Sequence, residues 1–178
     1  MRSIFLEKPD PLELRMRNSS VWGRVSVWLP VVVACLVIVA ESTDTFSADH
    51  TGGWLRPVLE RVFGPLRDET AGEINHYLRK TGHFCGYGTV CLTFLRAWLL
   101  TFGALTDLGR RAWRWRAVIA AVACTAFVAS MDEWHQSYIP SRTGTVHDAL
   151  LDTTGAAVSC GLVWLFFWRK QRRGRSLR

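Results

Sequence analysis

The sequence predicts an all-α integral membrane protein with four transmembrane helices, and three observations support this fold class. Hydrophobic residues make up 49% of the 178 residues, charged residues make up 21%, and the mean hydropathy of +0.09 is high for a soluble domain. Four apolar stretches are each close in length to the about 20 residues that an α-helix needs to cross a bilayer. Lys and Arg gather beside alternate ends of these stretches. An intrinsically disordered chain is excluded, because such chains lack the apolar content to form a core.

The predicted transmembrane helices span residues 21–40, 78–100, 117–134 and 149–168. The first begins too late for a cleaved signal peptide, and no small-residue cleavage site follows it, so we expect it to be retained. The third is the shortest, and the fourth carries Asp152 as its one charge. Together they define one four-helix membrane domain over residues 21–168, flanked by basic tails at 1–20 and 169–178.

The distribution of positive charge predicts the orientation. Basic residues gather in both tails and in the connection between the second and third helices, whereas the loop before the fourth helix has Arg142 alone. Because cytoplasmic loops carry an excess of Lys and Arg, we expect a multi-pass protein of the plasma membrane with both termini cytoplasmic. The net charge of +7 is then a topology signal. No nucleic-acid partner is expected.

A further helix is predicted in the first outer loop, residues 41–77. Its apolar residues recur with the period of an amphipathic helix: Trp54, Leu55, Val58, Leu59, Val62, Phe63 and Leu66. Such a helix lies in the plane of the membrane interface. We expect it to cover the mouth of the bundle, and the alternative is a lid that admits a lipid or a bulky amphiphile.

Unusual polar residues gather at one predicted membrane depth, on the outer side. They end the third helix, open the fourth and occupy the outer end of the second, where Lys80, His83 and Tyr87 share one helical face. Ionisable groups at that depth are costly, so they mark a site or pair with one another. Small residues at Gly82, Gly86, Gly155 and Ser159 predict close helix packing beside them. The candidate ligand-binding residues are Lys80, His83, Asp132, Glu133, Gln136, Arg142, Asp148 and Asp152.

The same residues resemble the VanZ-like family of membrane proteins over about residues 25 to 168. The matching motifs are Arg79-Lys80-Thr81-Gly82-His83-Phe84, Asp132-Glu133-Trp134-His135-Gln136, Pro140-Ser141-Arg142, Asp148 and Gly155. One departure is Asp152, where the family often has Asn. The resemblance implies the four-helix fold and a site at these positions. It also implies an association with resistance to teicoplanin, a glycopeptide antibiotic that carries a fatty acyl chain.

The favoured function is non-enzymatic: binding or shielding of an anionic amphiphile or envelope lipid at the outer leaflet. Lys80 and Arg142 would bind the anionic headgroup, since Arg can bind a phosphate through two parallel hydrogen bonds. Asp132, Asp148 and Asp152 would orient those cations. Membrane lipids are the expected partners, and this hypothesis needs neither a cofactor nor a metal.

Three alternatives remain open. A closed network of ion pairs among these residues would only fix helix packing. A hydrolase or transferase acting on lipid phosphates is a second alternative, because His83 and the pair Arg142 and His147 are similar to type-2 phosphatidic acid phosphatase signatures, with departures in spacing. A divalent metal site is the third, with ligands from His83, His135, Asp132 and Asp148.

Overall fold

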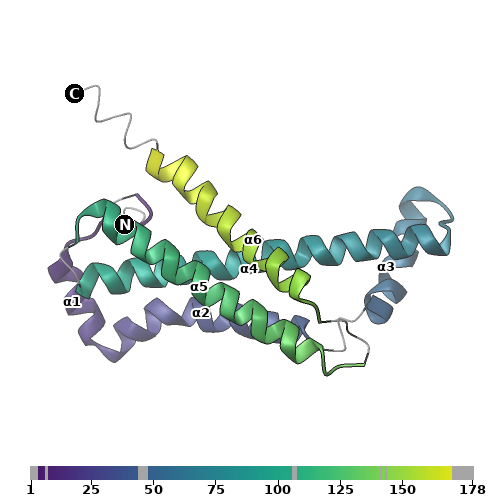
Figure 1. Ribbon diagram of the computed structural model, residues 1–178, viewed down its shortest axis with the longest axis horizontal. Coiled ribbons are helices and arrows are strands. Elements are labelled where there is room, and N and C mark those ends of the chain that lie inside the picture. The colour runs from purple at the N-terminus through teal and green to yellow at the C-terminus, as the bar shows by residue number, and fades with distance from the viewer. Residues whose placement is uncertain are drawn as a thin grey trace.

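The computed structural model describes residues 4–6, 8–43, 48–105, 108–140, 142 and 144–169, and every regular element in these ranges is a helix (Figure 1). Four helices are long and apolar enough to cross a membrane, which confirms the predicted fold class. The elements are α1 (Pro11–Ser19), α2 (Val21–Glu41), α3 (Ala48–Phe63), α4 (Asp68–Leu105), α5 (Arg110–Gln136), α6 (Val146–Val163) and a π-helical segment (Trp164–Trp168) that continues α6.

Helix α4 is much longer than the sequence predicts. It begins at Asp68 and not near residue 78, because its first turns are polar and hydropathy alone does not detect them. Asp68 and Glu69 suit a helix N-terminus, where the backbone N–H groups create a positive field. With 38 residues, α4 is about 57 Å long, nearly twice the about 30 Å of a bilayer core. Its N-terminal part therefore extends beyond the apolar region.

The core of the bundle lies along α4, which packs against α6, α5, α2 and α1. Fully buried Tyr87, Leu95 and Leu99 of α4 meet Trp113 and small residues of α5 and α6. The opposite faces are apolar and exposed, and α2 shows this most clearly, at Val25, Leu29, Val32, Val33, Leu36, Val37 and Val39. An exposed apolar belt of this kind suits contact with lipid and would be a liability in water.

Helices α4 and α6 approach closely at glycine. A Cβ atom on Gly155 would overlap backbone atoms of Phe84, and one on Gly88 would press on Ser159 Oγ. The sequence predicts Gly155 and Ser159 as small interface residues, and both lie there. The prediction is wrong for Gly82, because a Cβ atom on it would meet nothing within 4 Å. Gly88, one helical turn and a half further along, is the glycine at which α4 meets Ser159.

The start of the described chain and the end of α6 lie at the same end of the bundle (Figure 1). Trp168 Nε1 donates to the carbonyl oxygen of Phe5 at 2.6 Å, and Arg114 Nη2 donates to that of Leu6 at 2.9 Å. We call this the basic end, because Arg110, Arg111, Arg114 and Arg116 of α5 also lie there. Within the predicted tail, α1 is a helix capped by Asp10. A chain that crosses the membrane four times ends on the side where it began, which agrees with the closeness of these two ends. The cytoplasmic location of this end remains a prediction.

Helix α3 packs on the projecting part of α4. Thr51 Oγ1 donates to Asn75 Oδ1 at 3.2 Å, and both residues are buried. Arg56 binds Glu60 at 2.9 Å and Asp68 at 2.7 Å, and these hydrogen bonds raise the pKa of Arg56. The predicted amphipathic helix is therefore present, with an exposed apolar face at Trp54, Val58, Val62 and Phe63. Its position in the membrane interface stays a prediction.

Candidate functional site

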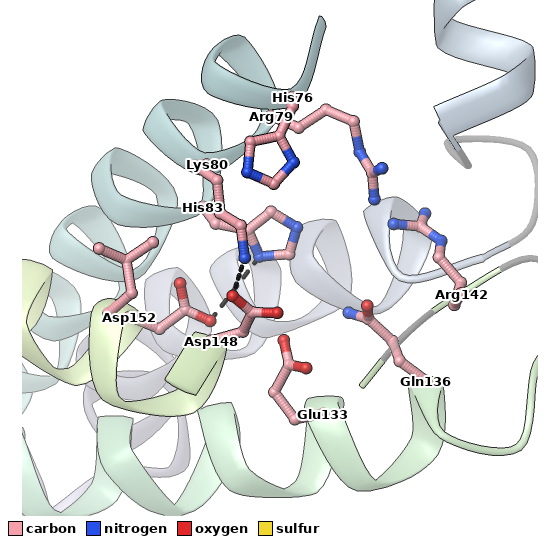
Figure 2. A pocket seen from close by; sticks show the side chains of 10 residues that line it. His76, Arg79, Lys80, His83, Glu133, Gln136, Arg142, Asp148 and Asp152 are labelled. Carbon is pink, nitrogen blue, oxygen red and sulfur yellow. Dashed lines mark ion pairs between the residues drawn. The ribbon is translucent and has the colours of Figure 1, made fainter. Parts of the chain in front are cut away.

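A charged cavity of about 240 Å³ lies where α4 passes the C-terminal end of α5 and the N-terminal end of α6 (Figure 2). Ten residues line it: His76, Arg79, Lys80, His83, Glu133, Gln136, Arg142, Asp148, Leu151 and Asp152. Seven of the eight candidate residues are among them. The charged cavity thus gathers side chains from three helices and one loop that are far apart in the sequence.

Local helix geometry explains which side chains meet. His76, Lys80 and His83 follow a spacing of four and three residues, so α4 presents them on one face. Glu133 and Gln136 occupy the last turn of α5, and Asp148 and Asp152 the first two turns of α6. Figure 2 shows the guanidinium groups of Arg79 and Arg142 on one side, while the carboxylates of Glu133, Asp148 and Asp152 lie on the other.

The loop between α5 and α6 is held close to the end of α5. Gly144 lies against the carbonyl oxygen of Glu133, and a Cβ atom at that position would overlap it. The next residue, Thr145, donates its backbone N–H to Glu133 Oε2 at 2.8 Å. The Thr145 hydroxyl oxygen also accepts from the backbone N–H of Asp148 at 3.2 Å, which caps α6. These contacts fix the Glu133 carboxylate and the start of α6 relative to one another.

Two ion pairs cross the charged cavity. Lys80 Nζ pairs with Asp148 Oδ1 (Figure 2). His83 Nδ1 lies 3.7 Å from Asp152 Oδ2, a distance too long for a hydrogen bond. Asp152 is fully buried, and neither of its carboxylate oxygens has a hydrogen-bond donor in the described part of the chain. Lys80 and Asp148 therefore compensate one another, whereas the Asp152 carboxylate is poorly compensated.

Arg142 performs a structural task as well as lining the cavity. Its Nη2 atom donates to the carbonyl oxygens of Glu41 and Thr43, both at 2.7 Å. Glu41 is the last residue of α2 and Thr43 follows just beyond its cap, a place where backbone oxygens lack partners within the helix. The buried Arg142 side chain therefore joins the loop before α6 to the end of α2.

Asp132 is the one candidate residue that does not line the charged cavity. It is buried, and its Oδ2 atom accepts hydrogen bonds from Tyr87 Oη at 2.8 Å and from Gln136 Nε2 at 3.0 Å. Asp132 and Gln136 are four residues apart and so share one face of α5. The geometry of Asp132 indicates a packing network between α4 and α5.

The sequence analysis missed His76, Arg79 and Leu151 as lining residues. The signal for His76 was its spacing from Lys80 and His83, which becomes visible only when α4 is extended toward Asp68. His135 and His147 are exposed and line no part of the charged cavity. The His83, His135, Asp132 and Asp148 grouping therefore does not form there. Instead, ligand atoms of His83, Glu133 and Asp152 all lie within 4.8 Å of one another.

A second, apolar cavity of about 400 Å³ lies between α2 and α4 and adjoins the charged one. The two cavities share Arg79, His83 and Arg142. Most of the remaining lining is apolar or small, namely Ala34, Val37, Ile38, Gly82, Gly86 and Val90, and its polar members are Glu41, Thr51 and Thr89. A polar compartment and an apolar compartment thus meet at three cationic or titratable side chains.

Comparison with known proteins identifies a family. The family model described as VanZ/LLP1 matches residues 27–167, which is most of the chain. Neither the curated proteins nor the solved structures contain a significant match.

Proposed function

Since the chain belongs to the VanZ/LLP1 family of membrane proteins, we propose that it binds an anionic amphiphile of the cell envelope. The headgroup would occupy the charged cavity, and the acyl chain would occupy the apolar cavity. One observation carries this proposal: the two cavities adjoin and share Arg79, His83 and Arg142. An amphiphile needs such a pair of compartments, whereas a small soluble anion needs only the first.

The cationic side of the charged cavity supports an anionic headgroup. Arg79 and Arg142 lie on the same side in Figure 2, where the two cavities join. Planar guanidinium groups bind phosphate oxygens through paired hydrogen bonds, and desolvation strengthens such bonds. Lys80 adds a third positive charge, which Asp148 positions. A phosphate-bearing headgroup fits this arrangement best.

The apolar cavity supports a chain that runs along α2 and α4. Gly82 and Gly86 line the apolar cavity from α4 and have no side chains to fill it. A Cβ atom on Gly82 would meet no atom within 4 Å. Val37 and Ile38 of α2 form the facing wall. Apolar ligand surface placed there stays out of water, and each buried methylene contributes about 0.8 kcal/mol.

If both termini are cytoplasmic, as the sequence predicts, this site would lie at the outer leaflet of the plasma membrane. In that position the protein would bind or shield a lipid-linked or acylated molecule outside the cytoplasm. Teicoplanin carries an acyl chain, so a survival assay in its presence tests the resistance association that the family resemblance implies. We propose binding, and not chemical turnover, as the activity.

The proposal is tested with the full-length protein in nanodiscs and a fluorescent phosphatidic acid as the probe. Gly82→Leu should place a bulky apolar side chain in the apolar cavity, where a Cβ atom alone meets nothing within 4 Å, and Arg79→Gln should remove a headgroup contact. Each variant should weaken binding at least about tenfold, which corresponds to about 1.4 kcal/mol. Gly161→Leu is the matched control, because Gly161 also has no neighbour within 4 Å of a built Cβ atom but lies on α6 away from both cavities.

Equal affinity of wild type and Gly82→Leu for the probe would contradict the two-compartment proposal. A zwitterionic phosphatidylcholine probe that binds as tightly as phosphatidic acid would contradict the headgroup assignment. Release of inorganic phosphate from phosphatidic acid by the wild type, abolished by His83→Gln, would replace binding with the hydrolase alternative.

A further inference from the structure

We propose that His83, Glu133 and Asp152 form a binding site for a divalent transition-metal ion. Within the described part of the chain these residues are the one group of three potential ligands whose atoms all lie within 4.8 Å of one another. They come from three different helices, α4, α5 and α6, and all three line the charged cavity. The argument rests on the burial of Asp152, the donor set and the way that the donors are held.

The Asp152 side chain is the observation that calls for a ligand. It is fully buried, it lines the charged cavity, and both of its carboxylate oxygens lack hydrogen-bond donors in the described chain. A buried carboxylate is strongly unfavourable unless a charge or hydrogen bonds compensate it. Among the described residues, the His83 ring at 3.7 Å is the one ion-pair partner of Asp152. A divalent cation between these residues would supply the missing compensation.

The donor set suits a metal ion. One imidazole nitrogen and two carboxylates match ions such as Mn²⁺ or Zn²⁺, which accept nitrogen and oxygen ligands together. Ligand atoms bound at about 2.1 Å stand roughly 3 to 4 Å apart around a metal, because they occupy the corners of a tetrahedron or octahedron. The 3.7 Å between His83 Nδ1 and Asp152 Oδ2 lies within this range. The remaining coordination positions would face the charged cavity.

Neighbouring groups already hold the donors in place. The backbone N–H of Thr145 binds Glu133 Oε2 at 2.8 Å, which orients that carboxylate. Gly155 brings α6 against Phe84 of α4, so Asp152, almost one turn earlier, is placed beside His83. Hydrogen bonds that orient ligands are typical of protein metal sites and affect metal affinity about 10–100-fold. His135 and Asp132, by contrast, are engaged with Ser42 and Tyr87.

The metal site does not depend on the headgroup proposal, although the two are compatible. Arg79, Lys80 and Arg142 balance Glu133, Asp148 and Asp152 in number, so the charged cavity is close to neutral when its histidines are neutral. A divalent cation together with a phosphate group would keep that balance. A metal-binding measurement in detergent without added lipid separates the two proposals.

The test uses full-length protein in detergent, freed of any polyhistidine tag and treated with chelator. Electron paramagnetic resonance follows the loss of free Mn²⁺ signal on binding, and calorimetry follows Zn²⁺. We expect saturation at one ion per chain. Asp152→Asn, Glu133→Gln and His83→Gln should each weaken binding at least about tenfold, in line with the affinity loss seen even for groups that only orient ligands. His147→Gln is the control, because His147 is exposed and lies outside the group, and it should keep the wild-type affinity.

Thermal unfolding shows whether each variant is folded. The melting temperature of the wild type should rise with added Mn²⁺ or Zn²⁺, because an ion that binds only the folded state stabilises it. Without metal, Asp152→Asn should melt at or above the wild-type temperature, since the neutral amide removes an uncompensated buried charge. Absence of saturable binding by both ions would overturn the proposal. So would a metal-free Asp152→Asn variant that is less stable than wild type, because Asp152 would then act as the ion-pair partner of His83.

Discussion

Arg96 of α4 donates a hydrogen bond from Nη1 to the carbonyl oxygen of Val27 in α2 at 3.1 Å, and the same atom lies 3.5 Å from the carbonyl oxygen of Ser26. Pro30 of α2 explains this contact. Proline has no backbone N–H, so the Ser26 carbonyl loses its partner four residues on, and the proline ring disturbs the turn before it. Arg96 of α4 thus supplies a hydrogen-bond donor to α2, where Pro30 has no backbone N–H.

Arg96→Met should therefore lower the free energy of unfolding by about 1–3 kcal/mol, because carbonyl oxygens in a helix predicted to span the membrane lose their donor. Pro30→Ala restores the missing N–H, so the same Arg96→Met substitution should cost clearly less in that background. Thermal unfolding of the four proteins in detergent measures the coupling. Additive effects of the two substitutions would show that Arg96 does not compensate for Pro30.

The close contact of α4 and α6 predicts a sharp difference between two glycines. Gly155→Ala should lower the free energy of unfolding by about 1–3 kcal/mol, because the new Cβ atom overlaps the Phe84 backbone and forces the helices apart. Gly161→Ala should be neutral or stabilising by up to about 1 kcal/mol, because no atom opposes it and Ala favours helix. Comparison of the two melting temperatures decides whether the helices meet where the structure places them.

The buried hydrogen bond between Tyr87 and Asp132 should support stability and not ligand binding. Tyr87→Phe removes the 2.8 Å hydrogen bond to Asp132 and should cost about 1–3 kcal/mol of stability. Binding of phosphatidic acid to the folded fraction should be unchanged, because neither Tyr87 nor Asp132 lines a cavity proposed for the lipid. A parallel measurement of melting temperature and lipid affinity tests this. A selective loss of affinity would return Asp132 to the ligand-binding residues.

The contact of Arg142 with α2 predicts a local effect. Arg142→Gln should loosen the C-terminal turn of α2, since the carbonyls of Glu41 and Thr43 lose a charged donor worth about 1.5–3 kcal/mol. Hydrogen–deuterium exchange should rise in the peptide that covers residues 38–43, while the first turns of α2 stay protected. Uniform exchange along α2 would instead indicate that the helix detaches as a whole.

The sequence predicts the membrane fold well, because bilayer thickness imposes a length and an apolar composition on every spanning helix. It also predicts that polar residues of three helices meet, since topology places their ends at one depth. Seven of eight candidate residues line the charged cavity on this basis. The order of charged and apolar segments thus predicts the depth at which a residue lies in the membrane.

Helix rotation is harder to predict than depth. Asp132 and Glu133 are adjacent in the sequence, yet Glu133 faces the charged cavity and Asp132 faces Tyr87. Neighbouring helical residues point about 100° apart, so the choice between them depends on packing that a single sequence does not display. The same reason explains why Gly88 and not Gly82 meets Ser159. His76 and Arg79 were missed for a different reason, because α4 remains helical where its composition turns polar.

The attachment of α2 has a consequence for how an amphiphile would reach its site. Arginine–carbonyl hydrogen bonds attach this helix near both of its ends, through Arg96 and Arg142. Between these points α2 borders the apolar cavity with Ala34, Val37 and Ile38. An acyl chain sliding in sideways from the bilayer would exchange one set of hydrocarbon contacts for another. The kinetic barrier to lateral exchange would then be set by the bulk of the side chains on the middle of α2, and the polar contacts would govern only how long the headgroup stays.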